Sequence, residues 1–397
     1  MRATIFMRPF FKRCSLSGGF LPVLIVVLGL VPGAVRAQVF DSAAPFAILI
    51  DADSGTVLFE KEADEPMAPA SMAKLMLVEY VFHALKEGRL SLTDKFVVSE
   101  NAWRKGGATS GGSTMFAKLD SSVSLNDLLH GIIIQSGNDA CIVVAEGLAG
   151  SEIAFSDLMN KRAKEIGLRN STFRNSTGLP DPDQKVTARD LSILARKIVL
   201  DYPEYYPIFA IPSFEWNGID QRNRNPLLTV GIGADGLKTG HTEESGYGLV
   251  GSAISNTQRL IVVVNGLESS RARAQEARKL LEWGFRTFRQ VTLFEDDEVV
   301  AEARVFGGSK GRVELKAKGP IRVLVSRSSS DSLIGRAVYT GPVEAPVEPG
   351  QEVGALKIFQ DERLIQETPL YTAETIGEGE LHQRAIDALG ELLLGWL

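Results

Sequence analysis

Two short motifs in this chain of 397 residues have the residue types and spacing for nucleophilic catalysis by a serine. Ser71-Met72-Ala73-Lys74 is the only S-x-x-K sequence in the chain, and it falls at the start of a predicted helix. A helix places residues three apart on one face, so the Lys74 amine can take the proton of the Ser71 hydroxyl. A free lysine has a pKa of ~10.4, so the site has to lower that pKa by burial or by a second cation.

The second cation comes from Lys238-Thr239-Gly240, the only K-T-G sequence, which lies in a predicted strand. Between the two motifs, Ser136-Gly137-Asn138 falls at a break between two predicted helices. It offers a hydroxyl that can relay a proton and an amide that can hold a peptide carbonyl. Taken singly, the three motifs are typical of a helix cap, a strand end and a turn. Together, in this order and in these contexts, they predict a serine and lysine active site.

Other catalytic centres find little support in the sequence. The histidines are not spaced as metal ligands on one element, and neither H-E-x-x-H nor C-x-x-C occurs, so we expect no metal and no cofactor. The four histidines are His83, His130, His241 and His382. Residues 307–311 match the G-x-S-x-G nucleophile elbow, but they lie between two strand-like runs, which predicts a hairpin turn.

Composition excludes several classes of protein. With 44% hydrophobic and 23% charged residues, the chain is neither disordered, collagenous nor a polytopic membrane protein. With a net charge of −6, the chain lacks the excess of basic residues that binds phosphate groups, so nucleic acid is not an expected partner. The two cysteines, Cys14 and Cys141, cannot form a disulfide framework. The chain is expected to fold.

The elements that must position these motifs form an α/β (α+β) pattern. Strands come first, a largely helical insertion follows, and strands return, so the sheet is assembled from both ends with helices packed on it. The expected elements are a hairpin over Phe46–Glu60, a helix from Pro69 to Leu85, a loop over Asn101–Leu119, helices over Ser124–Leu168, three strands over Asp235–Leu267 and a helix over Arg271–Phe288.

Beyond Gln290 the sequence consists of short β-rich runs separated by Gly, Pro and Ser, and this pattern predicts a small all-β domain. The two ends of the chain are different again. We expect a signal peptide at 1–37, a catalytic domain at 38–290, the small β-rich domain at 291–376 and an amphipathic membrane-anchoring helix at 377–397.

The N-terminal prediction depends on the order of basic, apolar and small residues that is typical of a secretory signal peptide. Residues 1–37 contain five basic residues and no acidic one, with an apolar run at Phe20–Val31 and a cleavage site after Ala37. An uncleaved anchor is the alternative, but the run is well short of the ~20 residues that span a bilayer. Cleavage would place the protein outside the cytoplasm.

The C-terminal stretch Leu381–Leu397 has one apolar face when it is placed on a helix. It carries charges and is too short to cross a bilayer, so it is expected to lie in a membrane interface. The alternative is a terminal helix docked on the protein's own core. The apolar face consists of Leu381, Ala385, Ala388, Leu389, Leu392, Leu393 and Trp396.

The motifs and their surroundings resemble the serine D-alanyl-D-alanine carboxypeptidases among the low-molecular-weight penicillin-binding proteins, over most of the chain after residue 37. The loop over Gly106–Ser113 is longer than is usual there, and the terminal helix is less basic. The similar segments are Pro69–Met76, Ser136–Cys141, Asn223-Arg224-Asn225, Asp235–Thr242 and Trp283-Gly284-Phe285.

This resemblance implies a serine transpeptidase and β-lactamase-like catalytic domain, with a role in peptidoglycan biosynthesis and cell shape. The substrate would be a peptidoglycan stem peptide ending in D-Ala-D-Ala, with β-lactam antibiotics as covalent inhibitors and no cofactor. The enzyme would sit peripherally on the periplasmic face of the inner membrane.

The resemblance also implies a role for each site residue. Ser71 would be the nucleophile, Lys74 its base and Ser136 a proton relay, and the backbone N–H groups of Ser71 and His241 would form the oxyanion hole. The expected substrate-binding residues are Asn138, Lys238, Thr239, Gly240, His241, Arg224 and Arg273.

Two alternatives stay open at this point. A class A β-lactamase would have Asp in place of Gly137 and a glutamate-positioned water. Glu165 is the nearest candidate for that glutamate, but it lies at a predicted helix end and lacks the asparagine that should follow. A non-catalytic protein that binds the cell wall is the second alternative, and it would be expected to have lost Ser71 or Lys74.

Overall fold

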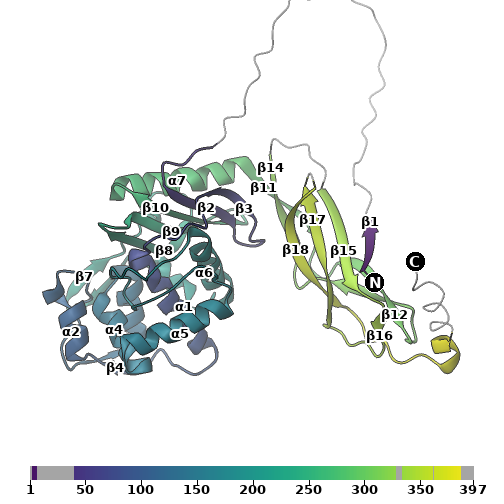
Figure 1. Cartoon of the computed structure of the whole chain (residues 1–397), viewed down its shortest axis with the longest axis horizontal. Helices are drawn as coiled ribbons and strands as arrows, with labels where there is room; N and C mark the ends of the chain where they lie inside the picture. The colour runs from purple at the N-terminus through teal and green to yellow at the C-terminus, as the bar shows by residue number, and fades with distance from the viewer. Residues whose placement is uncertain (1, 7–39, 328–332, 361, 386–397) are drawn as a thin grey trace, which may run out of the picture. The chain divides into compact units, whose positions relative to one another are not determined.

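The computed structural model describes residues 2–6, 40–327, 333–360 and 362–385 of the chain (Figure 1). These residues form two compact units. The larger unit consists of residues 42–291 and 322–328, and the smaller unit contains the β-rich remainder. Each unit has its own buried side chains and is described here by itself.

A five-stranded antiparallel sheet in the order β3-β2-β10-β9-β8 forms the frame of the larger unit. The residues from Leu260 to Val264 in β10 are all fully buried, as expected for a central strand that is covered on both faces. Helix α7 packs on one side of these strands and α6 on the other (Figure 1). The strands are β2 (Phe46–Asp51), β3 (Val57–Lys61), β8 (Ala234–Thr242), β9 (Gly246–Ser255) and β10 (Gln258–Leu267).

The segment between β3 and β8 is mostly helical. Its α-helices are α1 (Lys74–Lys86), α2 (Glu100–Gly106), α3 (Leu125–His130), α4 (Asn138–Ala149), α5 (Glu152–Glu165) and α6 (Ala188–Asp201), and α7 (Ser270–Thr287) follows β10. Tighter or wider turns are η1 (Ala70–Ala73), η2 (Ala108–Ser110), η3 (Gly131–Gln135), η4 (Tyr206–Ala210) and η5 (Pro226–Thr229). Two short hairpins pair β4 (Lys95–Val97) with β5 (Ser122–Ser124) and β6 (Ser213–Trp216) with β7 (Ile219–Arg222).

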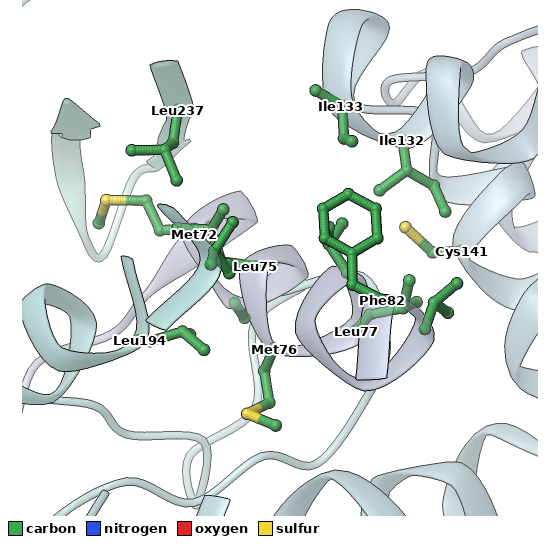
Figure 2. Packing of buried hydrophobic residues seen from close by; sticks show 14 of the residues in the cluster. Met72, Leu75, Met76, Leu77, Phe82, Ile132, Ile133, Cys141, Leu194 and Leu237 are labelled. Atoms are coloured by element: carbon green, nitrogen blue, oxygen red, sulfur yellow. The ribbon is translucent and has the colours of Figure 1, made fainter. Parts of the chain in front are cut away.

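Helix α1 is the central helix of this unit, because ten of its thirteen residues are buried. A helix that is apolar on nearly all sides has to be surrounded by other elements. Figure 2 shows Met72 and Leu75 near Leu237 of β8, and Phe82 near Cys141 of α4, within one buried cluster. The helix that begins at Lys74 is therefore fixed between the sheet and the helical segment.

A buried ion pair fastens α1 to its neighbours. The Glu79 carboxylate is fully buried and accepts hydrogen bonds from Arg162 of α5, the shortest at 2.8 Å. The hydroxyl of Tyr202, directly after α6, donates to the same carboxylate at 2.8 Å. Three helices are joined at one carboxylate, which restricts the orientation of α1 and of the residues at its start.

In the smaller unit, a seven-stranded sheet has the order β1-β15-β17-β18-β13-β12-β16. Alternate residues of β12 and β13 are buried, as expected for a sheet with one covered face. Strands β11 (Phe288–Phe294) and β14 (Ile321–Ser326) form a separate two-stranded sheet, and most of β14 belongs to the larger unit. The strands of the large sheet are β1 (Arg2–Phe6), β12 (Val299–Phe306), β13 (Arg312–Lys316), β15 (Leu333–Thr340), β16 (Val343–Glu344), β17 (Glu352–Gln360) and β18 (Arg363–Thr372).

Most of the expected elements are present, and the fold class is confirmed. The hairpin, the helices over 124–168, the three returning strands and the last helix form as predicted, and residues 307–311 form the turn between β12 and β13. The expected loop over Asn101–Leu119 is wrong in part, since α2 begins at Glu100 with Ser99 as its N-cap. Seven residues before a Gly pair give too little periodicity for a helix to be predicted there.

Both ends of the chain extend beyond the described residues. Arg2–Phe6, which falls in the predicted signal peptide, forms β1 and pairs with β15 in this uncleaved chain. The remainder of the signal peptide and most of the predicted amphipathic helix lie outside the described residues. Residues 381–385 of that helix are helical, and Leu381 is 87% exposed. No helix among the described residues has the length and apolar character to span a membrane.

The buried ion pair leads to a prediction about stability. Replacing Arg162 with Met leaves the buried Glu79 carboxylate without its cation, a change that costs ~3–5 kcal/mol in unfolding free energy. Urea unfolding followed by the fluorescence of Trp103, Trp216 and Trp283, all in the larger unit, measures this cost. As the control, Arg278→Met removes an exposed pair with Glu282 and should cost under ~1 kcal/mol. Equal costs for the two variants would contradict the prediction.

Candidate active site

Ser71 and Lys74 meet at the junction of η1 and α1. The Lys74 amine lies 2.8 Å from the Ser71 hydroxyl oxygen, and the Lys74 side chain is fully buried. The residue before Ser71 has a left-handed backbone, with a φ of 46° at Ala70, which is strained for a residue that is not glycine. A bend of this kind at the start of the helix turns the Ser71 hydroxyl toward the amine.

The Lys74 amine has three hydrogen-bond partners. Besides Ser71, it donates to the Asn138 side-chain oxygen at 2.9 Å and to the Thr177 carbonyl at 2.6 Å. Both of these oxygens only accept, so they bind the two N–H groups of a neutral amine and leave its lone pair facing the Ser71 hydroxyl. This arrangement orients a general base toward a nucleophile.

Burial is the main cause that lowers the pKa of Lys74, to about 8, and the charge of Arg224 lowers it further. Burial also lowers the pKa of Lys238 well below its usual range, and the charges of Lys74 and Arg224 add to that shift. The pKa of Lys74 is therefore lowered, as the sequence requires, but mostly through burial. The cation that adds to this effect is Arg224 and not Lys238, which the sequence suggests.

Ser136 lies on the turn between η3 and α4. Its φ of 66° is left-handed, and its hydroxyl is buried without a hydrogen-bond partner among the described residues. The next residue, Gly137, has no space for a side chain, since a Cβ there would lie 3.0 Å from the Met115 nitrogen. A class A β-lactamase would require Asp at this position, so the packing disfavours that alternative.

The K-T-G sequence lies on β8, the edge strand of the sheet, with Lys238 and Thr239 buried. Gly240 is needed for a close approach, because a Cβ there would lie 3.0 Å from the Pro69 carbonyl and 3.1 Å from the Ala70 Cβ. Strand β8 thus lies against the turn that carries Ser71. His241 stacks on Tyr247 with the ring centroids 3.8 Å apart.

A cavity of about 650 Å³ opens in front of these groups and has no acidic residue in its lining. Arg224 binds the Ser113 hydroxyl at 2.5 Å, while the Arg273 Nε is buried without a hydrogen bond in the described part of the chain. A cavity with cations and no acid is suited to an anionic ligand. The lining residues are Ser71, Gly111, Gly112, Ser113, Ser136, Arg224, Thr239, Gly240, His241 and Arg273.

The structure therefore brings the sequence-predicted side chains to one place: seven line the cavity, Lys74 and Asn138 are bonded directly behind Ser71, and Lys238 adjoins Thr239. Sequence reasoning missed the Thr177 carbonyl, the wall at Gly111–Ser113 and the buried carboxylate of Asp139. Only the Gly-rich composition of residues 106–113 gave any signal for them. Groups of three or more His, Cys, Asp or Glu that could hold a metal are not found among the described residues.

Sequence profiles of known protein families match both units of the chain. The sequence profile of the family described as D-alanyl-D-alanine carboxypeptidase matches residues 33–269, and that of the penicillin-binding protein 5 C-terminal domain matches residues 288–378. The D-alanyl-D-alanine carboxypeptidase DacC of Escherichia coli (strain K12) is 42% identical over 86% of each chain. DacA of the same organism is 33% identical over 99% of each chain.

A solved structure also resembles this chain. The crystal structure of penicillin-binding protein 5 from Haemophilus influenzae aligns with a TM-score of 0.76 and 36% identity, covering 85% of this chain and 98% of that one.

The pKa of Lys74 leads to a prediction about pH. Only the neutral amine can take the Ser71 proton, so the rate of Ser71 acylation should rise about tenfold per pH unit and level off above about pH 8. Arg224→Gln removes a cation that lowers this pKa, so the rise should move to higher pH. Stopped-flow acylation by a fluorescent penicillin measures both profiles.

The matched control for the pH profile is Arg278→Gln, which removes an exposed charge on α7 and should leave the profile in place. A profile that is flat with pH would contradict the role of Lys74 as the base, and a profile unmoved by Arg224→Gln would contradict the effect of Arg224 on the pKa of Lys74.

Proposed function

The chain belongs to the D-alanyl-D-alanine carboxypeptidase family, and we propose that it removes the terminal D-alanine of peptidoglycan stem pentapeptides through an acyl-enzyme on Ser71. It is a serine-type carboxypeptidase with a penicillin-binding protein fold. The hydrogen bonding of the Lys74 amine to Ser71, Asn138 and Thr177 is the observation that carries the assignment of roles.

In the first half of the proposed reaction, Ser71 Oγ attacks the carbonyl carbon of the penultimate D-Ala while its proton passes to the Lys74 amine. The tetrahedral oxyanion is held by the backbone N–H groups of Ser71 and His241, and the close approach of Gly240 to Ala70 supports this pair. Collapse breaks the peptide bond and leaves an ester on Ser71.

The departing amine of D-Ala needs a proton, which Ser136 relays. Its buried hydroxyl lines the same cavity and has no other described partner, which supports this role. The Asn138 amide holds the substrate's peptide carbonyl. Water then hydrolyses the ester, releases the shortened peptide and restores the Ser71 hydroxyl.

The terminal carboxylate of the substrate is received by Lys238, Thr239 and Arg273, with Arg224 nearby. Buried cations without acidic partners gain most from such an anion, since charge-assisted hydrogen bonds are roughly twice as strong as neutral ones. β-Lactam antibiotics carry a comparable carboxylate beside a reactive carbonyl and would acylate Ser71 as covalent inhibitors. The solved structure of penicillin-binding protein D2 from Listeria monocytogenes in an ampicillin-bound form supports this extension.

We propose the same domain organisation as the sequence predicts, with boundaries at 37, 290 and 376. Cleavage after Ala37 would export residues 38–397, and the C-terminal helix would hold the enzyme on the periplasmic face of the inner membrane. The exposed Leu381 at the start of that helix supports this position.

Labelling with a fluorescent penicillin tests the function. The wild type should give a persistent covalent band on a denaturing gel and should release D-Ala from a pentapeptide. Ser71→Ala should abolish both, because no other described serine has the Lys74 amine in contact. Ser309→Ala, which removes the serine of the G-x-S-x-G sequence, is the matched control and should keep both.

Each other outcome selects an alternative. Rapid loss of the wild-type band would favour a β-lactamase, and absence of a band would favour a binding protein without catalysis. A band on Ser71→Ala would refute the assignment of the nucleophile.

Membrane attachment has its own prediction. Deleting residues 381–397 should release the mature protein from membranes without changing the rate on a soluble peptide. The apolar face has five large side chains, each worth ~1.5–3 kcal/mol at full burial in the interface, so attachment should resist high salt. Fractionation with and without salt decides this. Release of the full-length protein by salt alone would rule out the apolar face as the anchor, and unfolding of the truncated protein would show that the helix packs on the core.

A further inference from the structure

A buried carboxylate next to the site is not used in the mechanism above. Asp139 lies in the first turn of α4, directly after Asn138, and is fully buried. Its Oδ2 accepts hydrogen bonds from the Thr114 hydroxyl at 2.7 Å and the Ala117 N–H at 3.0 Å, and its Oδ1 accepts from the Met115 N–H at 2.9 Å. One side chain therefore holds three residues of another segment, Thr114, Met115 and Ala117.

That segment continues directly into the wall of the cavity. Gly111, Gly112 and Ser113, which line the cavity, precede Thr114 in the chain. The Ser113 carbonyl accepts a hydrogen bond from the Asn138 N–H at 2.7 Å, and the Ser113 hydroxyl binds Arg224. The wall is thus fastened to the start of α4 by Asp139 and Asn138, and to a substrate-binding cation by Ser113.

The surroundings of Asp139 leave little space for adjustment. A Cβ on Gly106 at the end of α2 would lie 2.3 Å from the Asp139 nitrogen, and a Cβ on Gly137 would lie 2.9 Å from its Oδ1. Both glycines let their backbones approach this residue closely. A displacement of the carboxylate is therefore transmitted to the turn that carries Ser136 and Asn138.

We propose that Asp139 is a positioning residue for the reaction, which fixes the Gly111–Ser113 wall against the turn that carries Ser136 and Asn138. The proposal rests on the proposed function, since the wall matters to catalysis only when Ser71 reacts in this cavity. Asp139 acts through these groups and does not itself touch the substrate.

An amide cannot replace this carboxylate. Three donors converge on its two oxygens, so an asparagine would present its NH₂ group either to the Met115 N–H or to the Ala117 N–H. One buried donor is then left without an acceptor in either orientation, and the wall has to move. A shift of this size at a substrate-positioning element reduces kcat/KM by roughly tenfold to 100-fold.

The charge of Asp139 gives a second, independent readout. It raises the pKa of Lys74 against the stronger opposing effect of burial. Replacing it with a neutral residue should therefore move the pH profile of acylation to lower pH. The other charged or titratable groups that face Lys74 are Cys141 on α4, Glu152 on α5, Arg224 after β7 and Lys238 on β8, and none of them changes in this variant.

The experiment compares three variants of the full-length enzyme with the wild type on a D-Ala-D-Ala pentapeptide. Asp139→Asn should lower kcat/KM by roughly tenfold to 100-fold, mainly through KM, and should shift the acylation profile to lower pH. Thr114→Val removes one donor to Asp139 but keeps its charge, so it should raise KM less and leave the pH profile in place.

Asp190→Asn is the matched control. Asp190 is also a buried carboxylate in the first turn of a helix, and it accepts from the Asn170 N–H and the Ser171 hydroxyl away from the cavity. It should lose stability and keep the kinetic constants of its folded fraction. Penicillin labelling measures that fraction for each variant.

The outcomes are distinguishable. An Asp139→Asn enzyme with wild-type KM and pH profile, corrected for its labelled fraction, overturns this proposal alone. If Asp139→Asn does not fold, an unchanged KM in Thr114→Val overturns it. If the wild type itself is not labelled on Ser71, the proposed function fails and this proposal fails with it.

Discussion

The proposed chemistry of the larger unit depends on one constraint, which is that the Lys74 amine is kept out of water. An isolated ammonium is expensive to bury, so burial lowers the pKa of a lysine in such a place. Lys74 is fully buried because it starts the central helix, which the sheet and the helical segment surround. Among the described residues, only acceptors and the Ser71 hydroxyl are hydrogen bonded to the amine. The fold thus lowers the pKa of the proposed base by removing solvent, and the proposed nucleophile follows from its position three residues earlier.

Two of the strained backbone positions lie next to that amine. Ala70 and Ser136 have left-handed backbones although neither is glycine, and each such residue costs on the order of 1–3 kcal/mol. Gly178, also left-handed, approaches the Ala70 carbonyl so closely that a Cβ would lie 1.9 Å from it. These costs are tolerated because the sheet, the core around α1 and the Glu79 to Arg162 ion pair determine the positions of the strained residues independently.

Sequence reasoning found what depends on side-chain type and missed what depends on the backbone. The strands over Asp235–Leu267 were predictable from their apolar runs, and the three motifs from their residue types and spacing. The Thr177 carbonyl was not, since every residue carries one and only the fold brings it to Lys74. Helix α2 was too short for a periodic signal. Helix α6 was also missed, although Thr187 caps α6 in the way a sequence can indicate.

Several causes lower or raise the pKa of Lys74, and the largest of them decides how the amine responds to an anionic substrate. A base made neutral mainly by neighbouring cations would regain its proton when a substrate carboxylate arrived and offset their charge. Burial has the opposite effect on the amine when the substrate arrives. A bound peptide removes more water from the cavity, and this favours the neutral amine. In this chain burial is the largest cause, and Arg224 adds a smaller effect. The cations can therefore attract a carboxylate without being the main cause that lowers the pKa of Lys74.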